Sequence, residues 1–236
     1  MSAPQRQRWW AVVPAAGQGK RMGADIPKQY LSIGGETLLS RSVKRLLKSS
    51  RLEQVAVAVS REDQRWHELS IMSDVRVSVV IGGAERADSV LAGLQALTNA
   101  SDSDWVIVHD AARPCVSSAA LRAMFDALAD DPVGGIMAVP VADTLKQADN
   151  NRNIVATVDR SQLWAAQTPQ MFRYGLLRDA LQHALASGQQ VTDEASALEL
   201  AGHTPKLFPG SSRNIKITQP EDLELASRIL EAQGDG

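Results

Sequence analysis

The feature that most constrains the fold of this chain is the alternation of short apolar runs with helical patterns over its first 140 residues. Runs rich in Val, Ile and Ala lie near residues 9–13, 54–59, 76–81, 105–109 and 135–139. Each is nearly continuous in apolar character, which is typical of strands that are covered on both faces. Alternating strands and helices predict strand–helix–strand units on a largely parallel sheet. The fold class is therefore α/β, with three layers.

Helices are expected where apolar residues recur every three or four positions. In residues 37–47, one such stripe carries Leu39, Val43 and Leu46. Similar patterns predict helices over 89–97, 117–130, 173–187, 192–201 and 218–232. The last of these opens with Thr218-Gln-Pro-Glu221, a capping signature with proline in the first turn.

The segment 141–160 interrupts this rhythm. It is polar, rich in Asp and Asn, and carries no sustained helical stripe. Long excursions of this kind are usually functional or disordered. Its inner part, from Thr144 to Val158, predicts a β-hairpin that turns between Asp149 and Asn153.

Bulk composition limits the possible classes of function. The chain has 236 residues, of which 44% are apolar and 22% charged, so one globular domain over 1–236 is expected and disorder is not. Its net charge of −2 gives no general reason to expect nucleic acid or a membrane surface as partner. Cys115 is the single cysteine, which excludes an intrachain disulfide and fits a cytoplasmic location. No apolar run approaches the roughly 18 to 20 residues of a membrane-spanning helix.

The turn after the first strand is the strongest chemical signal. Pro14-Ala-Ala-Gly-Gln-Gly-Lys-Arg-Met22 joins an apolar run to a glycine-rich turn, and Lys28 follows in Pro27-Lys-Gln-Tyr30. Glycines let backbone N–H groups approach anionic oxygens, and the cations supply opposing charge, so a nucleoside triphosphate is the expected ligand. The spacing matches neither the dinucleotide fingerprint, which needs glycine at position 22, nor the Walker loop, which needs a hydroxyl after Lys20.

Two further loops follow strands and are expected at the same edge of the sheet. In His109-Asp-Ala-Ala-Arg-Pro114, Asp110 would lie at the carboxyl end of its strand, facing the first loop. A carboxylate there suits Mg²⁺ beside a triphosphate, although it also suits a helix cap, and His109 is expected to be structural. In Gly82-Gly-Ala-Glu-Arg-Ala-Asp-Ser89, Ser89 either bonds a base or caps the helix, and Arg86 is either a surface charge or a brace for the loop.

Several motifs, in this order, resemble those of one enzyme family. They are Pro14-Ala-Ala-Gly-x-Gly-x-Arg-Met, Pro27-Lys-Gln-Tyr, Gly82-Gly-x-x-Arg-x-x-Ser-Val, His109-Asp-Ala-Ala-Arg-Pro, Thr157-Val-Asp-Arg, Thr168-Pro-Gln, Thr192-Asp-Glu-Ala and Asn214-Ile-Lys-Ile-Thr. The family is 2-C-methyl-D-erythritol 4-phosphate cytidylyltransferase, of the non-mevalonate isoprenoid pathway, and the resemblance covers roughly residues 9–230. It implies a Rossmann-like nucleotidyltransferase fold with a protruding β-arm at about 141–163. It also implies a homodimer in which each arm reaches the partner's active site.

The resemblance implies a role for individual residues. Mg²⁺ is the expected cofactor, with Asp110 as its candidate ligand. The implied catalytic residues are Arg21, Lys28, Arg160 and Lys216; the nucleotide-binding residues are Pro14, Ala15, Ala16, Gly17, Gly83, Ser89, Asp110 and Ala111; and the substrate-binding residues are Arg113, Thr144 and Thr168.

The expected reaction is attack of a phosphate monoester on the α-phosphorus of CTP. A phosphate oxygen is already ionised near neutral pH, so neither a covalent intermediate nor a general base is required. A related cytidylyltransferase that uses ribitol 5-phosphate is the nearest alternative. A nucleotide-dependent dehydrogenase and a non-catalytic nucleotide sensor are more distant ones.

Overall fold

The structure, a computed structural model, describes residues 8–17 and 26–234. Its centre is a seven-stranded sheet with the order β11-β7-β10-β6-β1-β4-β5. All neighbouring pairs are parallel except those of β10, which runs antiparallel to both β6 and β7. The strands are β1 (Trp9–Ala15), β4 (Leu52–Val59), β5 (Val77–Ile81), β6 (Trp105–Val108), β7 (Gly134–Pro140), β10 (Trp164–Arg173) and β11 (Lys206–Pro209).

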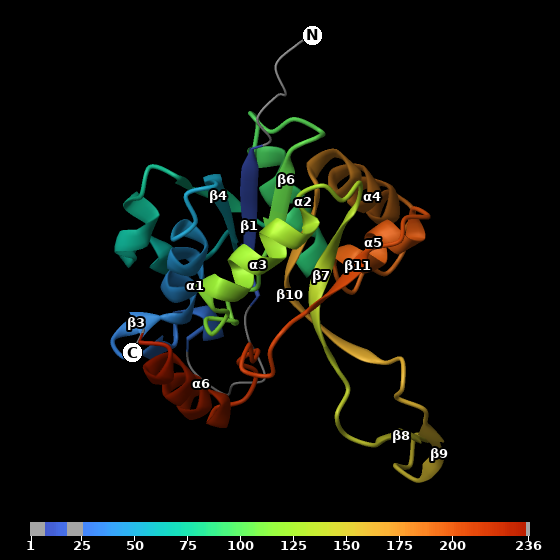
Figure 1. Cartoon of the computed structure of the whole chain (residues 1–236). Coiled ribbons are helices and arrows are strands. Elements are labelled where there is room, and N and C mark those ends of the chain that lie inside the picture. Colours follow the sequence, from blue (N-terminus) through green and yellow to red (C-terminus); the bar gives the residue numbers. More distant parts are fainter. Residues whose placement is uncertain (1–7, 18–25, 235–236) are drawn as a thin grey trace.

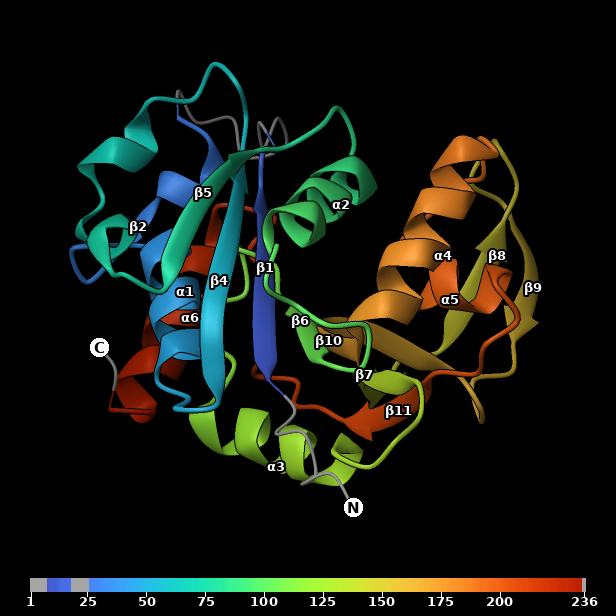
Figure 2. The ribbon, with the colours of Figure 1, turned by 90° about the horizontal axis from the view of Figure 1, so that it is seen from above.

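Helices cover both faces of this sheet, as Figure 2 shows from above. Alternate residues of β1 point to opposite faces: Val13 enters the core under α1 and α3, whereas Val12 enters the core under α2, α4 and α5. The predicted three-layer α/β arrangement is confirmed. The helices are α1 (Leu38–Leu47), α2 (Arg86–Ala96), α3 (Ser118–Leu128), α4 (Tyr174–Ala186), α5 (Glu194–Leu200) and α6 (Glu221–Ala232).

Smaller elements complete the body of the molecule. A short hairpin, β2 (Ser32–Ile33) and β3 (Glu36–Thr37), packs near α6, where Ile33, Ile217 and Leu230 share a small apolar cluster. Three 3₁₀ turns, η2 (Lys28–Tyr30), η3 (Arg65–Glu68) and η4 (Ser70–Ser73), lie in the connections of the described chain. In that described part, none of the helices has both the length and the apolar composition needed to span a bilayer.

The predicted hairpin is confirmed and projects from the body as an arm (Figure 1). Its strands are β8 (Leu145–Ala148) and β9 (Ile154–Val158), which pair antiparallel. The carboxylate of Asp149 accepts the backbone N–H groups of Asn151 and Asn153, at 2.9 and 2.8 Å, and so closes the turn. The arm is continuous with β7 and β10, which lead into and out of it.

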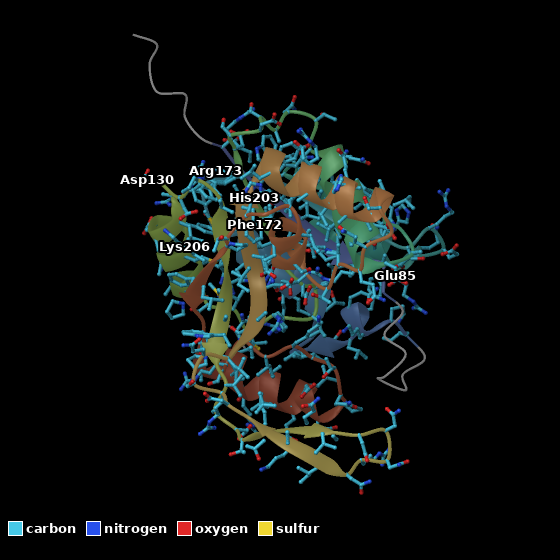
Figure 3. All side chains as sticks on the ribbon, turned by 90° about the vertical axis from the view of Figure 1, so that its right-hand side faces the viewer. Glu85, Asp130, Phe172, Arg173, His203 and Lys206 are labelled. Atoms are coloured by element: carbon cyan, nitrogen blue, oxygen red, sulfur yellow. The ribbon has the colours of Figure 1, made fainter. Side chains whose placement is uncertain are left out.

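At the end of the sheet opposite the loops after β1, β5 and β6, Arg173 packs on a buried ring and donates to a backbone carbonyl. The guanidinium of Arg173 lies 3.8 Å from the ring centroid of Trp105 and donates to the carbonyl of Asp131 at 2.8 Å. In Figure 3, Arg173 and Glu85 lie on opposite sides of the molecule. Glu85 belongs to the carboxyl edge of the sheet, because it follows β5.

Two strands were missed, one predicted helix cap is wrong, and one of the two roles left open for Ser89 is excluded. Strands β10 and β11 were not predicted at all. The Thr218–Glu221 capping signature does not form, because α6 begins at Glu221 with Pro220 at its N-cap and no side-chain cap hydrogen bond. The carboxylate of Asp222 instead reaches back to accept the N–H groups of Thr218 and Gln219, at 2.7 and 2.8 Å. Nor does Ser89 cap its helix, because α2 begins three residues earlier and its N-cap is Glu85.

Candidate functional site

A cleft lies at the carboxyl edge of the sheet, where the loops after β1, β5 and β6 meet; it is called here the central cleft. It contains every residue predicted to bind the nucleotide, together with two predicted catalytic lysines. Arg21, the other predicted triphosphate ligand, lies outside the described residues. The lining comprises Pro14, Ala15, Ala16, Gly17, Lys28, Gln29, Gly83, Ala84, Glu85, Arg86, Ser89, Asp110, Ala111, Ala112 and Lys216.

Lys28 is held at this cleft by its neighbour. The Gln29 side chain is buried, and its Nε2 donates to the carbonyl of Ala15 at 2.7 Å. This bond ties the 3₁₀ turn η2 to the end of β1. The spacing of Pro27-Lys-Gln-Tyr therefore places Lys28 on the rim of the cleft while its neighbour anchors the turn.

The loop after β5 is shaped tightly against α2. Its backbone N–H at Gly83 donates to Oγ of Ser89 at 3.2 Å, and that hydroxyl lies 3.1 Å from the carbonyl of Glu85. A Cβ at Gly83 would stand 2.2 Å from the Cβ of Asp88, so a side chain here would displace the loop. The loop thus presents backbone groups to the cleft at close range, with Ser89 holding their geometry.

Asp110 is buried among three cations. Its Oδ1 accepts from Nε and Nη2 of Arg86 at 3.1 and 3.0 Å, and its Oδ2 accepts from Nζ of Lys216 at 2.7 Å. Arg113 approaches Oδ2 to 3.9 Å. Burial raises the pKa of Asp110, but the charges of Arg86 and Lys216 outweigh it and hold the pKa well below its usual range. Asp110 is therefore ionised at any pH of interest.

Arg86 also pairs with a carboxylate that sequence reasoning did not select, Glu194. Its Nη1 and Nη2 donate to the two oxygens of Glu194 at 2.6 and 3.1 Å. Glu194 is 1% exposed, and burial raises its pKa although the charge of Arg86 opposes this. Of the two roles left open for Arg86, bracing of the loop matches the structure. The signal for Glu194 was weak, because an acid at a helix start resembles an ordinary cap and its partner is 108 residues away.

His109 orients the Thr168 hydroxyl. Oγ1 of Thr168 accepts the backbone N–H of Asp110 at 3.0 Å, so its own proton is directed to Nδ1 of His109, 3.1 Å away. Nε2 of His109 then carries the ring proton and donates to the carbonyl of Arg113 at 3.0 Å. Burial lowers the pKa of His109 to about 4, which keeps the ring neutral. His109 is structural, as expected.

A second hollow, called here the side cleft, adjoins the central one. It contains Arg113 and Thr168, two of the predicted substrate ligands. Arg86, Asp110 and Lys216 line both clefts, and these three residues are called the partition. The side cleft is lined by Arg86, Asp110, Arg113, Ala166, Gln167, Thr168, Gln170, Thr192, Asp193 and Lys216.

Two predicted site residues are not brought to either cleft. Thr144 and Arg160 are exposed on the arm and are absent from both linings. Figure 1 shows the arm extending away from the body of its own chain. Within one described chain, the cleft residues and the arm residues are therefore separate.

The side chains do not fit a metal held by the protein itself. Among the described residues, no group of three or more His, Cys, Asp or Glu side chains is suited to hold a metal. Both oxygens of Asp110 already accept from cationic groups, so a divalent cation bound there would face Arg86 and Lys216. A cation in the central cleft would need most of its ligands from a bound phosphate and water, as Mg²⁺ commonly does.

Comparisons with known proteins point to one family. The family model for 2-C-methyl-D-erythritol 4-phosphate cytidylyltransferase matches residues 9–232. A protein of that name from Pseudomonas entomophila is 54% identical over 218 residues, which cover 92% of this chain and 93% of the relative. The crystal structure of the enzyme from Francisella tularensis has a TM-score of 0.83 at 35% identity, covering 95% of this chain and 100% of that one. The enzyme from Thermus thermophilus has a TM-score of 0.78 at 30% identity, with coverage of 95% and 100%.

Proposed function

The chain belongs to the 2-C-methyl-D-erythritol 4-phosphate cytidylyltransferase family, and we propose that its two clefts divide the substrates of that reaction between them. The enzyme transfers CMP from CTP to 2-C-methyl-D-erythritol 4-phosphate and releases pyrophosphate, a step of isoprenoid precursor biosynthesis. CTP occupies the central cleft, and the acceptor phosphate enters from the side cleft. Support comes from the partition of Arg86, Asp110 and Lys216, which borders both clefts.

The chemistry follows from the charges. A phosphate oxygen of the acceptor attacks the α-phosphorus of CTP, a new P–O bond forms, and the bond from that phosphorus to the bridging oxygen of the leaving pyrophosphate breaks. The electron pair leaves with pyrophosphate. The protein must bring two anions together and stabilise the charge that grows on the pentacoordinate phosphorus. The cationic side chains at the two clefts suit this task.

Lys28 and Lys216 are assigned to different phosphate groups of the reaction. Lys28 lines the central cleft and not the side cleft, so we assign it to the triphosphate and the leaving pyrophosphate. Lys216 lines both clefts and has a side chain that is 37% exposed, which suits contact with both the attacking phosphate and the α-phosphate. Arg21 is assigned to the triphosphate from the sequence alone.

Pro14, Ala15, Ala16 and Gly17 are assigned to the nucleotide, as are the residues of the other two loops. Gly83 and Ser89 read the base through the tightly shaped loop after β5, and Asp110 with Ala111 lies near the ribose. Arg113 and Thr168 are assigned to the acceptor from their place in the side cleft. Mg²⁺ is expected to enter with CTP, held by its phosphate oxygens, and it would neutralise part of their charge.

We propose that the arm forms the contact between the two subunits of a homodimer. We take residues 1–236 as one domain with the arm at about 141–163. Ile154, Val155 and Val158 are 67%, 57% and 37% exposed along β9, and an isolated two-stranded hairpin is only marginally stable in water. A second copy of the chain, related by a two-fold axis, would cover the face of β9 that carries Ile154 and Val158. It would also bring Arg160 and Thr144 to the cleft that their own chain does not let them reach.

The other functions considered are less well supported. The family model and the relatives carry the methylerythritol phosphate name, so ribitol 5-phosphate is not favoured as acceptor. A dehydrogenase or a sensor without turnover is not favoured for the same reason.

Pyrophosphate release from CTP and Mg²⁺ tests the function directly. Three reactions are compared: with 2-C-methyl-D-erythritol 4-phosphate, with ribitol 5-phosphate and with no acceptor. Release that depends on methylerythritol phosphate is expected. Release only with ribitol 5-phosphate would show that the acceptor is assigned wrongly. No release in any of the three reactions would contradict the proposed activity.

A further inference from the structure

The motif Thr192-Asp193-Glu194-Ala195 contributes Thr192 and Asp193 to the side cleft, but Glu194 has no assigned part in the reaction. Glu194 is its most buried polar side chain, at 1% exposed, and it lines neither cleft. A buried carboxylate is costly unless it is paired and hydrogen-bonded. Both oxygens of Glu194 meet that requirement through Arg86, at 2.6 and 3.1 Å.

The position of Glu194 is fixed relative to the sheet. Asp193 caps α5 by accepting the N–H of Ser196 at 3.0 Å. The side-chain amide of Gln170, on β10, donates to Asp193 at 2.8 Å and accepts the N–H of Ala195 at 3.0 Å. Because β10 pairs with β6, the strand that leads to Asp110, the start of α5 and the central cleft share one rigid support.

Glu194 begins a series of alternating charges that ends at the reacting groups. The guanidinium of Arg86 donates to Glu194 along one edge and to Asp110 along another, so two carboxylates fix its plane. The other oxygen of Asp110 holds Lys216 at 2.7 Å. The order is therefore Glu194, Arg86, Asp110, Lys216, drawn from four separate segments of the chain.

We propose that Glu194 is a positioning residue for the transfer reaction, which holds Arg86 so that Asp110 keeps Lys216 at the partition. The proposal rests on the function proposed above, in which Lys216 contacts the reacting phosphates. Without the carboxylate of Glu194, Arg86 has two N–H groups to satisfy and turns them toward Asp110. Arg86 then occupies both oxygens of Asp110, and Lys216 loses its anchor.

The first test is Glu194→Gln, which keeps the shape of the side chain and removes its charge. Glu199→Gln is the matched control, since Glu199 lies on the same helix and is exposed. We expect kcat to fall about tenfold or more in Glu194→Gln, with the KM for CTP within about twofold of wild type, because a small displacement of a catalytic group acts mainly on turnover. Glu199→Gln should match wild type in both. A wild-type kcat in folded Glu194→Gln would overturn the proposal.

A double-mutant cycle separates positioning from simple loss of structure. In a Lys216→Met background the group that Glu194 positions is gone, so adding Glu194→Gln should change kcat/KM by less than about twofold. If the fold-losses in kcat/KM of the two substitutions instead multiply, Glu194 acts independently of Lys216 and the proposal is wrong. Should Glu194→Gln fail to fold, Arg86→Lys takes its place in the same cycle, because one ammonium group cannot bridge both carboxylates as a fork does.

The result is distinguishable from failure of the proposed function. If wild type releases no pyrophosphate with methylerythritol phosphate, the function itself is wrong. If wild type is active and Glu194→Gln behaves as Glu199→Gln does, only the positioning role is wrong.

Discussion

The carboxyl edge of the sheet and the arm, the two regions assigned to the proposed site, are built in opposite ways. At the edge, Asp110 is buried and its charge is matched by cations from distant segments. On the arm, Arg160 is exposed and apolar side chains such as Ile154 face outward. The first region is organised within one chain. The second exposes its charged and apolar side chains to solvent, and we propose that a partner subunit covers them.

Their acidic groups show the same contrast. Hydrogen bonds from the Asn153 side chain and backbone lower the pKa of Asp149, and those from Ser161 lower the pKa of Asp159, so both shifts on the arm arise within a few residues. The pKa of Asp110 reflects burial and cations that lie 24 and 106 residues away along the sequence, Arg86 and Lys216. Of these two regions, the edge is the one whose electrostatics depend on residues distant in the sequence.

Lys28→Ala is expected to have the largest effect, and it acts on the edge alone. Turnover should fall by about 10²- to 10³-fold, because a cation aimed at a transferring phosphate acts mainly in the transition state. Steady-state kinetics and thermal unfolding measure the two consequences, and the melting temperature should barely change. Arg122→Ala, which removes an exposed cation from α3, is the control. Intact turnover in Lys28→Ala would remove Lys28 from its assigned role.

Ile154→Asp tests the arm with a smaller effect. A charge in the exposed apolar row of β9 should disfavour the dimer, and the activity should fall about tenfold or more at low enzyme concentration. Analytical ultracentrifugation measures the assembly alongside the assay. Leu225→Asp is the control, because Leu225 is 51% exposed on α6 and lies outside the arm. Equal mass and equal activity in both variants would contradict an interface on the arm.

His109 gives a prediction about stability rather than catalysis. Its pKa is about 4 in the folded chain and about 6.5 in an unfolded one, so the unfolded state binds more protons between these values. Stability should therefore decrease as the pH falls from about 6.5 toward 4, by up to about 3 kcal/mol. Urea unfolding against pH should show this slope in wild type and lose it in His109→Gln. His183→Gln, at an exposed position on α4, should keep the slope.

The sequence predicted the parts of the fold that depend on local pattern. Strands buried on both faces appear as apolar runs, and loops that follow parallel strands must meet at one edge, so Gly83 and Asp110 were expected together. Strand β10 was missed because its middle carries Gln167, Thr168 and Gln170, polar residues that are buried. Each finds its partners in distant segments, which no local pattern reveals.

Long-range pairing also explains what was missing from the site. The sequence indicated Arg86 and Asp110 as loop residues, but it did not predict the ion pair between them. The Thr192-Asp-Glu-Ala motif contains Glu194 but predicts no role for it, because its partner Arg86 lies on another helix. Residue identity thus located the clefts, whereas the charge network behind them required the tertiary fold.

The most direct test of the proposed shared site is complementation between two inactive variants. Arg160→Ala damages the arm and Lys28→Ala damages the edge. In a mixed dimer, one site combines the intact edge of the first chain with the intact arm of the second, and the other site combines both lesions. Random mixing makes half of the dimers mixed, so the mixture should recover about a quarter of the wild-type activity. If confirmed mixed dimers show no more activity than the two parents, the edge and the arm do not form one site across subunits.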